Sequence, residues 1–462
     1  MNTIIQEIVE KITKDYKKCV ENMLEGKSDV SEMIQELRKT LDNVGSKLVG
    51  EAIEILDEVL RESKVRKRDY HIQRRNDSKT LITQFGEVRY ERTYFKSKKN
   101  KKCVYLADTI VGINPHDRID LSLKAQMIEN SHDLSYEKAS AKASKNVAIT
   151  RQTVLNSIRE LGVIQNNEVK PQEKKKDIRR LYIEADEDHV AMQKGTNKII
   201  KLIYVHEGKK VISKGRNQLQ NVRYFTGEYK ASEDLWLEVA NYLEQAYDMG
   251  KVEKIYLSGD GAKWIKEGLN WIDRSEFVLD YFHLWKYIKK ATVHMKHTRE
   301  VLWKYIRDLN KKGVKELLDF IIQNTEIDSK KESIRESKRY IMNHWQGIKR
   351  GFEEEYVGCS AEGHISHILS ERLSSRPMGW SLIGADQMAR IRVYKANKGN
   401  IHELMKKKRE ETKKEFRIQQ LEKRVIKRAK QQLGFSNLNN IPVLNYGKKT
   451  WQRQCLKSIV NV

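Results

Sequence analysis

RLYIEAD at residues 180–186 and KIYLSGD at residues 254–260 are the two stretches that decide the fold. Both are short apolar runs of the kind that forms a buried strand, and both end in an aspartate. The surrounding sequence predicts two more strands and two helices, at residues 190–193, 201–206 and 233–249 and after residue 261. This order indicates one mixed sheet in which neighbouring strand ends bring Asp186 and Asp260 together.

Paired carboxylates of this kind point to a metal site, because two carboxylates without a cation between them repel each other. Oxygen ligands favour Mg²⁺ or Mn²⁺, which keep some of their waters and bind substrate phosphates. Two such ions activate an attacking hydroxyl and stabilise the leaving oxygen when a phosphodiester is cleaved. The pair therefore predicts a nuclease or strand-transfer centre. The alternative is a pair of solvated surface charges, as most of the 64 acidic residues must be.

Composition favours a nucleic-acid partner. The 462 residues carry 89 Lys and Arg against 64 Asp and Glu, a formal net charge of +25, and a protein this basic binds polyanions. No run approaches the roughly 18–20 apolar residues of a membrane span. Acidic residues interrupt the apolar N-terminus, so no signal peptide is expected. Four cysteines without a C-x-x-C pair argue against a disulfide framework and a zinc ribbon, and they predict a cytoplasmic location.

Two regions open the chain. Residues 1–75 repeat apolar side chains at helical spacing, with a break at 26–28, and such helices pack either on another subunit or on their own chain. Residues 76–115 alternate as the strands of a small β module, with Gly86-Glu87 as a hairpin turn and a third strand at 103–106. The basic residues of this module either follow a phosphate backbone or form a solvated face: Arg89, Arg92, Lys96, Lys98 and Lys99.

Residues 116–178 return to helical spacing in three short segments, at residues 121–128, 136–143 and 151–161. Thr150 is a suitable N-cap for the last segment, whose first turn presents Arg151, Gln152 and Thr153. Short helices followed by one with polar donors at its N-terminus are typical of a helix-turn-helix that reads base edges. We therefore predict DNA binding by these three residues. The polar stretch at 166–176 indicates a linker.

The remainder of the chain divides into two predicted regions. Residues 179–400 contain the two aspartates and a charged helical insertion at about residues 284–357. The tryptophans of the insertion either anchor its core or stack on an unpaired base: Trp285, Trp303 and Trp345. Residues 401–462 begin with a basic helix that reaches residue 433, with 12 Lys or Arg against 4 Glu between Lys406 and Lys430.

Four longer strings carry a family resemblance: YIEADEDHVAMQ (182–193), YLSGDGAKWI (256–265), FVLDYFHLWKYI (277–288) and CSAEGHISHILSERLSSRPMGWS (359–381). They resemble the ISLre-type insertion-sequence transposases of bacteria, which look like distant relatives of the Mutator-type transposases. The resemblance extends from the GEVRYERTYFK hairpin at residues 86–96 to the GWS segment. It implies an RNase H-like catalytic domain with an Asp-Asp-Glu triad.

The resemblance places the triad on particular residues. Its first aspartate falls on Asp186, with Asp188 as the second choice, and its second falls on Asp260. The family glutamate opens a helix and therefore matches Glu362 rather than Glu371, which at 100° per residue would lie on the opposite face of that helix.

A second motif of the family is only partly matched. Where the Mutator-like pattern has Cys-x-x-His, this chain has Asp280-Tyr-Phe-His283. This substitution leaves His283 a supporting role and puts a zinc or thiol role there in doubt.

The last of these strings allows two other interpretations. Cys359, His364 and His367 are conceivable zinc ligands, but they have no tight fourth partner and no C-x-x-C motif. Arg372 and Arg376 follow Glu362 where a phosphate could pass, and the alternative for them is an exposed basic face.

The combined expectation is a mixed α/β protein with an RNase H-like core, preceded by helical, β-hairpin and helix-turn-helix DNA-binding modules. It predicts a bacterial, cytoplasmic and nucleoid-associated transposase that uses Mg²⁺ or Mn²⁺ to cut transposon ends and join them to target DNA. Its partners would be double-stranded DNA, at terminal inverted repeats and at the target, and further copies of itself. Two alternatives stay open: a non-catalytic DNA-binding protein, either a regulator or a decayed transposase, and a metal-dependent structure-selective nuclease.

Overall fold

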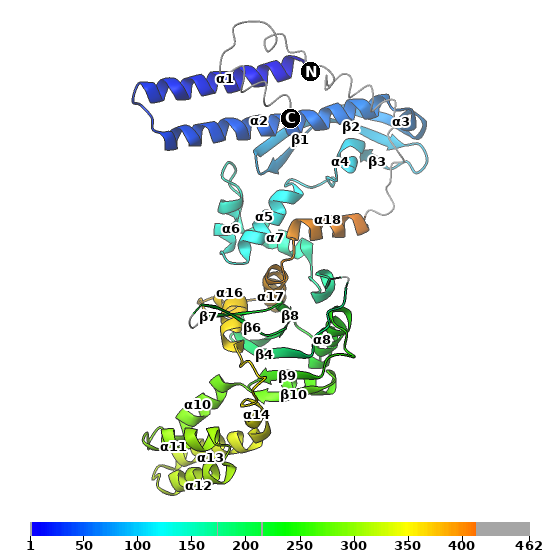
Figure 1. The fold of residues 1–462 in the computed structure, drawn as a ribbon. Coiled ribbons are helices and arrows are strands. Elements are labelled where there is room, and N and C mark those ends of the chain that lie inside the picture. Colours follow the sequence, from blue (N-terminus) through cyan, green and yellow to red (C-terminus); the bar gives the residue numbers. More distant parts are fainter. Residues whose placement is uncertain (1, 173, 214–215, 413–462) are drawn as a thin grey trace. The chain divides into compact units, whose positions relative to one another are not determined.

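The computed structural model describes residues 2–172, 174–213 and 216–412 (Figure 1). The chain is mixed α/β, as predicted, and divides into two compact units. The first unit takes the described residues of Met1–Ser131, Ser135–Ser157 and Met405–Val462, and the second takes His132–Leu134 and Ile158–Leu404. None of the described helices is long and apolar enough to cross a membrane.

The first unit opens with two long helices, α1 (Asn2–Leu24) and α2 (Val30–Glu62), which are separated by the predicted break. A short helix, α3 (Lys64–Asp69), follows them. Asp29 starts α2 with a capping box, since its carboxylate accepts from the Glu32 backbone N–H at 2.8 Å and the Glu32 carboxylate accepts from the Asp29 N–H at 3.1 Å. The helical prediction for residues 1–75 is confirmed as far as Asp69, and from Tyr70 onward the chain is already in strand β1.

A three-stranded antiparallel sheet packs against α2: β1 (Tyr70–Thr83), β2 (Gly86–Ser97) and β3 (Cys103–Tyr105), followed by α4 (Leu106–Ile110). Thr83 pairs with Gly86, so the hairpin turn is Gln84-Phe85 and the predicted turn at Gly86-Glu87 is wrong by two residues. Gly86 has a φ of +105°, a conformation that glycine adopts without strain, and it opens the second strand.

Three short helices follow where the spacing predicts them, α5 (Leu121–Ser131), α6 (Tyr136–Ala143) and α7 (Arg151–Leu161). Ser135 caps α6 by accepting from the Lys138 N–H. The predicted basic C-terminal helix begins as α18 (Ile401–Thr412), and its predicted continuation to residue 433 lies outside the described residues.

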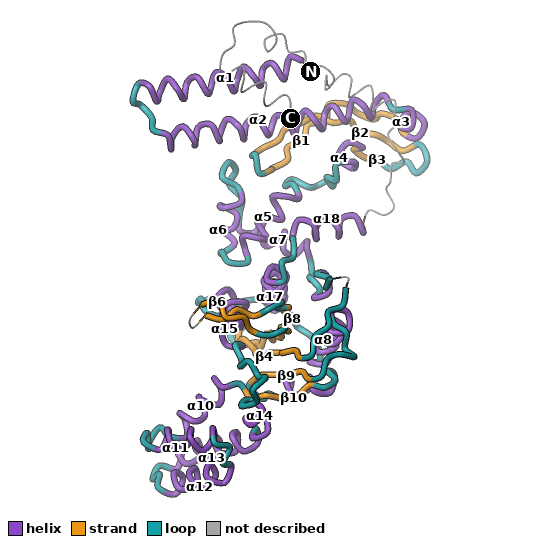
Figure 2. The backbone as a smooth tube through the Cα atoms, viewed as in Figure 1, coloured by secondary structure: helices purple, strands orange, loops and turns teal. Residues whose placement is uncertain are grey.

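The second unit is built on one five-stranded sheet with the order β10-β9-β4-β5-β8 (orange in Figure 2). Its strands are β4 (Arg180–Ala191), β5 (Asn197–His206), β8 (Arg223–Thr226), β9 (Lys254–Gly259) and β10 (Ser275–Leu279). β4, β5 and β8 pair antiparallel, whereas β9 and β10 run parallel to β4. The mixed sheet that the two aspartate strings predict is therefore confirmed.

The two faces of this sheet differ. Ile183, Ala185 and Ile203 face an apolar core shared with Trp236 and Val239 of α8 (Ser232–Ala246). Successive side chains of a strand point to opposite faces, so the residues between them lie on the other face. That face carries polar residues, and α15 (Ala361–Ile365) packs against it at β4.

The predicted helical insertion is present as α10 (Tyr281–Ala291), α11 (Thr298–Arg307), α12 (Lys311–Gln323), α13 (Asp328–Asn343) and α14 (Trp345–Arg350). Helices α10–α13 form a group beyond the β10 edge (Figure 1), and α14 contacts β10. Its tryptophans belong to the core: Trp345 is buried, and the rings of Trp285 and Trp303 meet edge to face at 5.5 Å.

Beyond α15 the chain continues through a π-helical turn (Ser366–Ser370), α16 (Glu371–Leu373) and α17 (Leu382–Ala396). Shorter elements complete the second unit: η1 (Asn166–Glu168), the hairpin β6 (Lys209–Ser213) and β7 (Arg216–Leu219), α9 (Lys263–Lys266) and η2 (Glu267–Asn270).

Three details correct the sequence-based expectations. Val190 belongs to the continuous strand β4, so residues 190–193 do not form a separate strand. The stretch 166–176 does not begin as a solvated linker, because Asn166 is buried and its amide donates to the Thr226 carbonyl at 3.0 Å. The hairpin β6–β7 and the strands β8 and β10 were not predicted.

Candidate functional site

Asp186 and Asp260 are brought side by side by the pairing of β4 with β9. The parallel register ends with Glu184 opposite Ser258, so two residues further along the same direction Asp186 lies beside Asp260. Asp260 comes directly after Gly259, the last residue of β9. A Cβ atom on Gly259 would lie 2.8 Å from the Ala185 carbonyl oxygen, so only glycine allows the two chains to approach this closely.

Asp186 does not end its strand, contrary to the prediction, since β4 continues to Ala191. The pairing of β4 with β9 ends at Glu184, and Asp186 is the next residue of β4 whose side chain lies on the polar face. Asp186 is 7% exposed, and one carboxylate oxygen accepts from the Glu187 backbone N–H at 2.9 Å. A carboxylate therefore lies in a largely enclosed position at the end of β9.

The electrostatics of Asp186 identify its neighbours. The pKa of Asp186 is raised to about 6. Burial and the negative charges of Glu362 and Asp260 raise it, whereas the hydrogen bond from the Glu187 backbone N–H and the charge of His283 lower it. Asp260, Glu362 and His283 are therefore each within electrostatic reach of Asp186. Asp186 is destabilised as an anion here, and a cation between the carboxylates would relieve that repulsion.

His283 is held beside this cluster by its own helix. Asp280 is the N-cap of α10 and accepts from the Phe282 N–H at 3.1 Å, while its second oxygen lies 3.1 Å from His283 Nδ1. Burial lowers the pKa of His283, but the hydrogen bond and charge of Asp280, with the charges of Asp186 and Asp260, raise it overall. Asp280 thus replaces the cysteine of the Cys-x-x-His pattern as a partner that favours a protonated His283.

Glu362 is positioned by Glu184, a residue that the sequence did not single out. Glu184 is 1% exposed, and its carboxylate accepts hydrogen bonds from the Tyr204 hydroxyl, from His206 Nε2 at 2.9 Å and from the Ser360 backbone N–H at 2.5 Å. Ser360 is the residue directly before α15, and Glu362 is the second residue of that helix. Glu184, on β4, therefore holds the N-terminus of α15 against the sheet, and α15 contains Glu362.

The charge of Glu184 is strongly favoured despite its burial. Burial alone would raise its pKa, but the hydrogen bond and charge of His206, together with Tyr204 and Ser360, lower the pKa to about 2. The Cys359 thiol also donates to this carboxylate, at 3.2 Å. A buried anion with this many donors is an anchor rather than a group that exchanges protons near neutral pH.

Asp188 lies on the same face of β4 as Asp186, two residues further along the strand. It is 7% exposed, and one carboxylate oxygen accepts from the Ser374 hydroxyl at 2.8 Å. The other oxygen, Oδ2, is buried and has no hydrogen-bond partner among the described residues. Asp188 thus stays a second-choice carboxylate of the site and is not a surface charge.

Within residues 2–172, 174–213 and 216–412, no three His, Cys, Asp or Glu side chains are arranged closely enough to hold a metal ion by themselves. Mg²⁺, however, is usually held by one or two carboxylates together with waters and substrate phosphates. The adjacent pair Asp186 and Asp260 fits that mode of binding, with Glu362 in reach. The zinc alternative fits less well, because Cys359 donates to Glu184 and His364 Nδ1 lies 2.7 Å from the Tyr224 hydroxyl.

A model described as an uncharacterised protein family, UPF0236, matches residues 8–410. The chain belongs to the UPF0236 family. A UPF0236 protein of Caldanaerobacter subterraneus subsp. tengcongensis is 42% identical over 442 residues, which are 95% of this chain and 93% of that protein. A second relative, described as a UPF0236 protein in the vanSb 3′ region of Streptococcus gallolyticus, is 26% identical over 384 residues, covering 79% of this chain and 83% of that protein.

The predicted DNA-reading residues of this UPF0236 protein lie at the start of α7. Arg151 and Gln152 are exposed and Thr153 is half-buried. The Gln152 amide donates to Asn156 Oδ1 at 2.9 Å, and the hydroxyls of Thr150 and Thr153 lie 3.1 Å apart. Two of the three predicted side chains are thus accessible to a partner, and their role stays a prediction.

The structure buries two of the arginines that were considered as phosphate contacts, Arg372 and Arg92. Arg372 is 2% exposed, with its guanidinium 4.9 Å from the centre of the Trp380 ring, so it packs inside the unit and does not face a phosphate. Arg376, four residues later, is exposed. In the β module of this UPF0236 protein, Arg92 is buried against Asp108 and does not follow a nucleic-acid backbone.

Proposed function

We propose that this UPF0236 protein is a metal-dependent DNA transposase whose reaction centre consists of Asp186, Asp260 and Glu362. The observation that carries the proposal is the register of β4 and β9, which sets two carboxylates side by side with the third within electrostatic reach. One enclosed aspartate with a raised pKa beside two further carboxylates is the electrostatic setting in which a divalent cation is favoured.

The sheet topology supports an RNase H-like assignment for the second unit. In chain order its strands are β4, β5, β8, β9 and β10, and the first three form an antiparallel meander. The fourth and fifth are added parallel to the first strand, on its other side. An RNase H-like fold has this order and these directions, with carboxylates on its first and fourth strands, which here correspond to Asp186 and Asp260.

The residues of the site would divide the work as follows. Mg²⁺ or Mn²⁺, held by Asp186, Asp260 and Glu362 when bound, would activate the attacking hydroxyl and stabilise the leaving oxygen. Asp260 is fixed because its carboxylate accepts from the Ala262 N–H at 2.7 Å. His283 supplies a positive neighbour oriented by Asp280, and it stabilises charge on the two aspartates.

In the proposed reaction, water breaks a phosphodiester bond at the transposon end and leaves a 3′-hydroxyl. That hydroxyl then attacks a phosphodiester of the target, so one phosphorus–oxygen bond forms as another breaks. No step requires a covalent bond between protein and DNA.

Charge and gene number also support a transposase. The net charge of +25 suits duplex DNA as a partner, both at inverted terminal repeats and at the target. The name of one Caldanaerobacter relative consists of eleven gene labels, and another consists of four. A protein encoded at many places in one genome is what a mobile element produces. We propose accordingly that the protein acts as a homo-oligomer on DNA in the bacterial cytoplasm, associated with the nucleoid.

The test is metal-dependent nicking of a labelled DNA fragment that contains the element's end. Asp186→Asn, Asp260→Asn and Glu362→Gln should each slow nicking about a thousandfold, because a metal ligand contributes several kcal/mol and about 1.4 kcal/mol is tenfold in rate. DNA binding should persist in all three variants. Glu371→Gln is the matched control, since Glu371 is exposed and its partner Arg392, at 3.3 Å, also donates to Asp133 and to three backbone carbonyls.

The alternatives give different results in the same assay. A wild-type protein that binds ends but never nicks them in Mg²⁺ or Mn²⁺ would be a DNA-binding regulator. Nicking without joined products would make it a structure-selective nuclease. An active Glu362→Gln beside an inactive Glu371→Gln would move the third ligand and leave the reaction class intact.

A further inference from the structure

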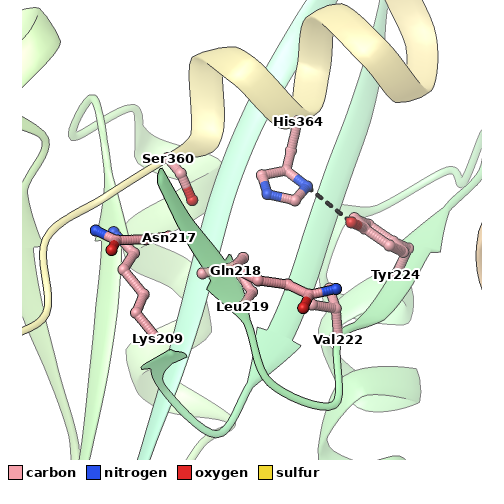
Figure 3. Close-up of a pocket in the computed structure, with 8 residues that line it drawn as sticks. All are labelled: Lys209, Asn217, Gln218, Leu219, Val222, Tyr224, Ser360 and His364. Atoms are coloured by element: carbon pink, nitrogen blue, oxygen red, sulfur yellow. Dashed lines mark hydrogen bonds between the residues drawn. The ribbon is translucent and has the colours of Figure 1, made fainter. Parts of the chain in front are cut away.

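A polar pocket of about 420 Å³ lies between α15, strand β8 and the β6–β7 hairpin (Figure 3). Ser360 and His364 point from the α15 side toward the hairpin, and Tyr224 of β8 closes the pocket with its hydroxyl 2.7 Å from His364 Nδ1. Asn217 and Gln218 line the hairpin side, and their amides form no hydrogen bond with the described residues. The pocket thus contains hydrogen-bonding groups that have spare capacity.

The pocket lies on the same face of the sheet as the reaction centre. Glu184 pairs with Tyr204, which pairs with Tyr224, so all three side chains share one face with Asp186. Two strand spacings separate Glu184 from Tyr224, or about 9–10 Å. Ser360 and His364 lie on one side of α15 and Glu362, at 100° per residue, lies on the other. The pocket is therefore about one helix width from the proposed point of cleavage.

A second hollow of about 650 Å³ adjoins the pocket at the hairpin and shares Gln218, Leu219, Val222 and Tyr224 with it. Among the described residues that line it none is acidic, and five are basic: Lys170, Lys176, Lys210, Lys398 and Arg223.

Two of these basic residues are already engaged. Lys176 pairs with Glu207 at 2.7 Å, and Arg223 donates to two backbone carbonyls. Lys170, Lys210 and Lys398 are exposed and form no ion pair with any described residue. We call this second hollow the lysine groove. Three such exposed cations in one groove attract a chain of phosphates rather than one small anion.

We propose that the pocket and the lysine groove together bind a single-stranded segment of DNA next to the cleaved bond, with its phosphates on Lys170, Lys210 and Lys398 and one unpaired base in the pocket. A base within a duplex is stacked and cannot enter such a pocket, whereas an unpaired base is read by hydrogen bonds to its edge and by ring contacts. Asn217 and Gln218 supply the hydrogen bonds, and the His364 ring supplies the contact surface. This inference rests on the proposed function and adds the strand that the second unit holds.

The experiment measures binding of a fluorescent single-stranded oligonucleotide to the full chain, without divalent metal, over a range of salt concentrations. Each phosphate contact to a single strand contributes about −0.7 to the slope of log affinity against log salt. The triple variant Lys170→Ala, Lys210→Ala, Lys398→Ala should therefore have a slope shallower by about 2. A matched control removes the same charge from exposed lysines of the insertion: Lys304→Ala, Lys311→Ala and Lys315→Ala.

A second arm reports on the base. A 2-aminopurine placed along the single strand should fluoresce differently at one position when bound, and the double variant Asn217→Ala, Gln218→Ala should remove that signal while the slope is retained. A mononucleotide alone should give neither signal, because it lacks the phosphates for the lysine groove. Equal slopes for the groove variant and its control would overturn the inference.

Failure of this inference and failure of the proposed function are separable. Because the binding is measured without metal, a protein that nicks DNA ends but shows no effect in either arm retains the function and loses the groove. A protein that shows both effects and never nicks DNA retains the groove and loses the transposase assignment.

Discussion

Replacing Glu184 with alanine removes, in one step, the acceptor for Tyr204, His206 and the Ser360 backbone N–H. The Tyr204 and His206 side chains are 1% and 0% exposed, so both donors lose a buried acceptor. A hydrogen bond to a charged group contributes about 1.5–3 kcal/mol, and two such donors left buried cost about 3–6 kcal/mol. For a unit of this size each kcal/mol lowers the melting temperature by about 2–4 °C, which predicts a fall of about 6–24 °C.

The measurement is thermal unfolding by circular dichroism together with hydrogen exchange. Glu184→Ala should accelerate exchange most at the first turn of α15, because that turn loses its attachment to β4. Glu184→Gln keeps an acceptor oxygen and should fall between the wild type and the alanine variant. Glu355→Ala is the control: Glu355 pairs with Arg180 at 3.3 Å on the surface, and such pairs contribute about 0–1 kcal/mol. The anchoring role would be refuted if Glu184→Ala had the same melting temperature as the control and the same protection from hydrogen exchange in α15 as the wild type.

Three further outcomes are expected. Binding of the full chain to random duplex DNA should weaken steeply with salt, by about −0.9 in log–log slope per phosphate contact, and a slope near zero would exclude nucleic acid as the partner. Asp108→Asn leaves the buried cations Lys79 and Arg92 without their carboxylate. Calorimetry should therefore show a free energy of unfolding that is lower by about 3–5 kcal/mol. An unchanged melting temperature would contradict the stabilising role of these ion pairs. Mn²⁺ should raise the melting temperature of the wild type, since it binds only the folded carboxylate site, and an equal rise in the Asp186→Asn, Asp260→Asn double variant would place the ion elsewhere.

Apolar runs and helical spacing in the sequence predicted the strands and helices that depend on neighbouring residues. The apolar runs that end at Asp186 and Asp260 form neighbouring strands, and the helical spacing before residue 70 forms α1 and α2. The strand β4 was predicted too short, because the charged residues that follow Asp186 look like a loop. In the folded unit Asp188 alternates onto the polar face and Val190 is fully buried, so the strand continues through them.

Glu184 was missed because its importance depends on distant parts of the chain. In the sequence it is one more acidic residue in a strand, but its donors come from the next strand and from Ser360, which is 176 residues away. Arg372 was misjudged for the same reason, since only the fold shows that the Trp380 ring covers its guanidinium. Local spacing indicates which residues share a face, and it does not indicate what another segment brings to that face.

The hydrogen bond between Glu184 and the Ser360 backbone N–H also bears on the order in which parts of the second unit fold. Closing a loop of 176 residues costs about 4–5 kcal/mol in chain entropy if the loop is unstructured, and much less once the helices α10–α14 have shortened it. The sheet, with both aspartates, depends on nearer contacts and can form earlier during synthesis. On this argument we expect the third carboxylate to join last, when α15 docks on β4. A chain that ends before α15 would lack Glu362, so the proposed centre would be complete only after the insertion and α15 have been synthesised.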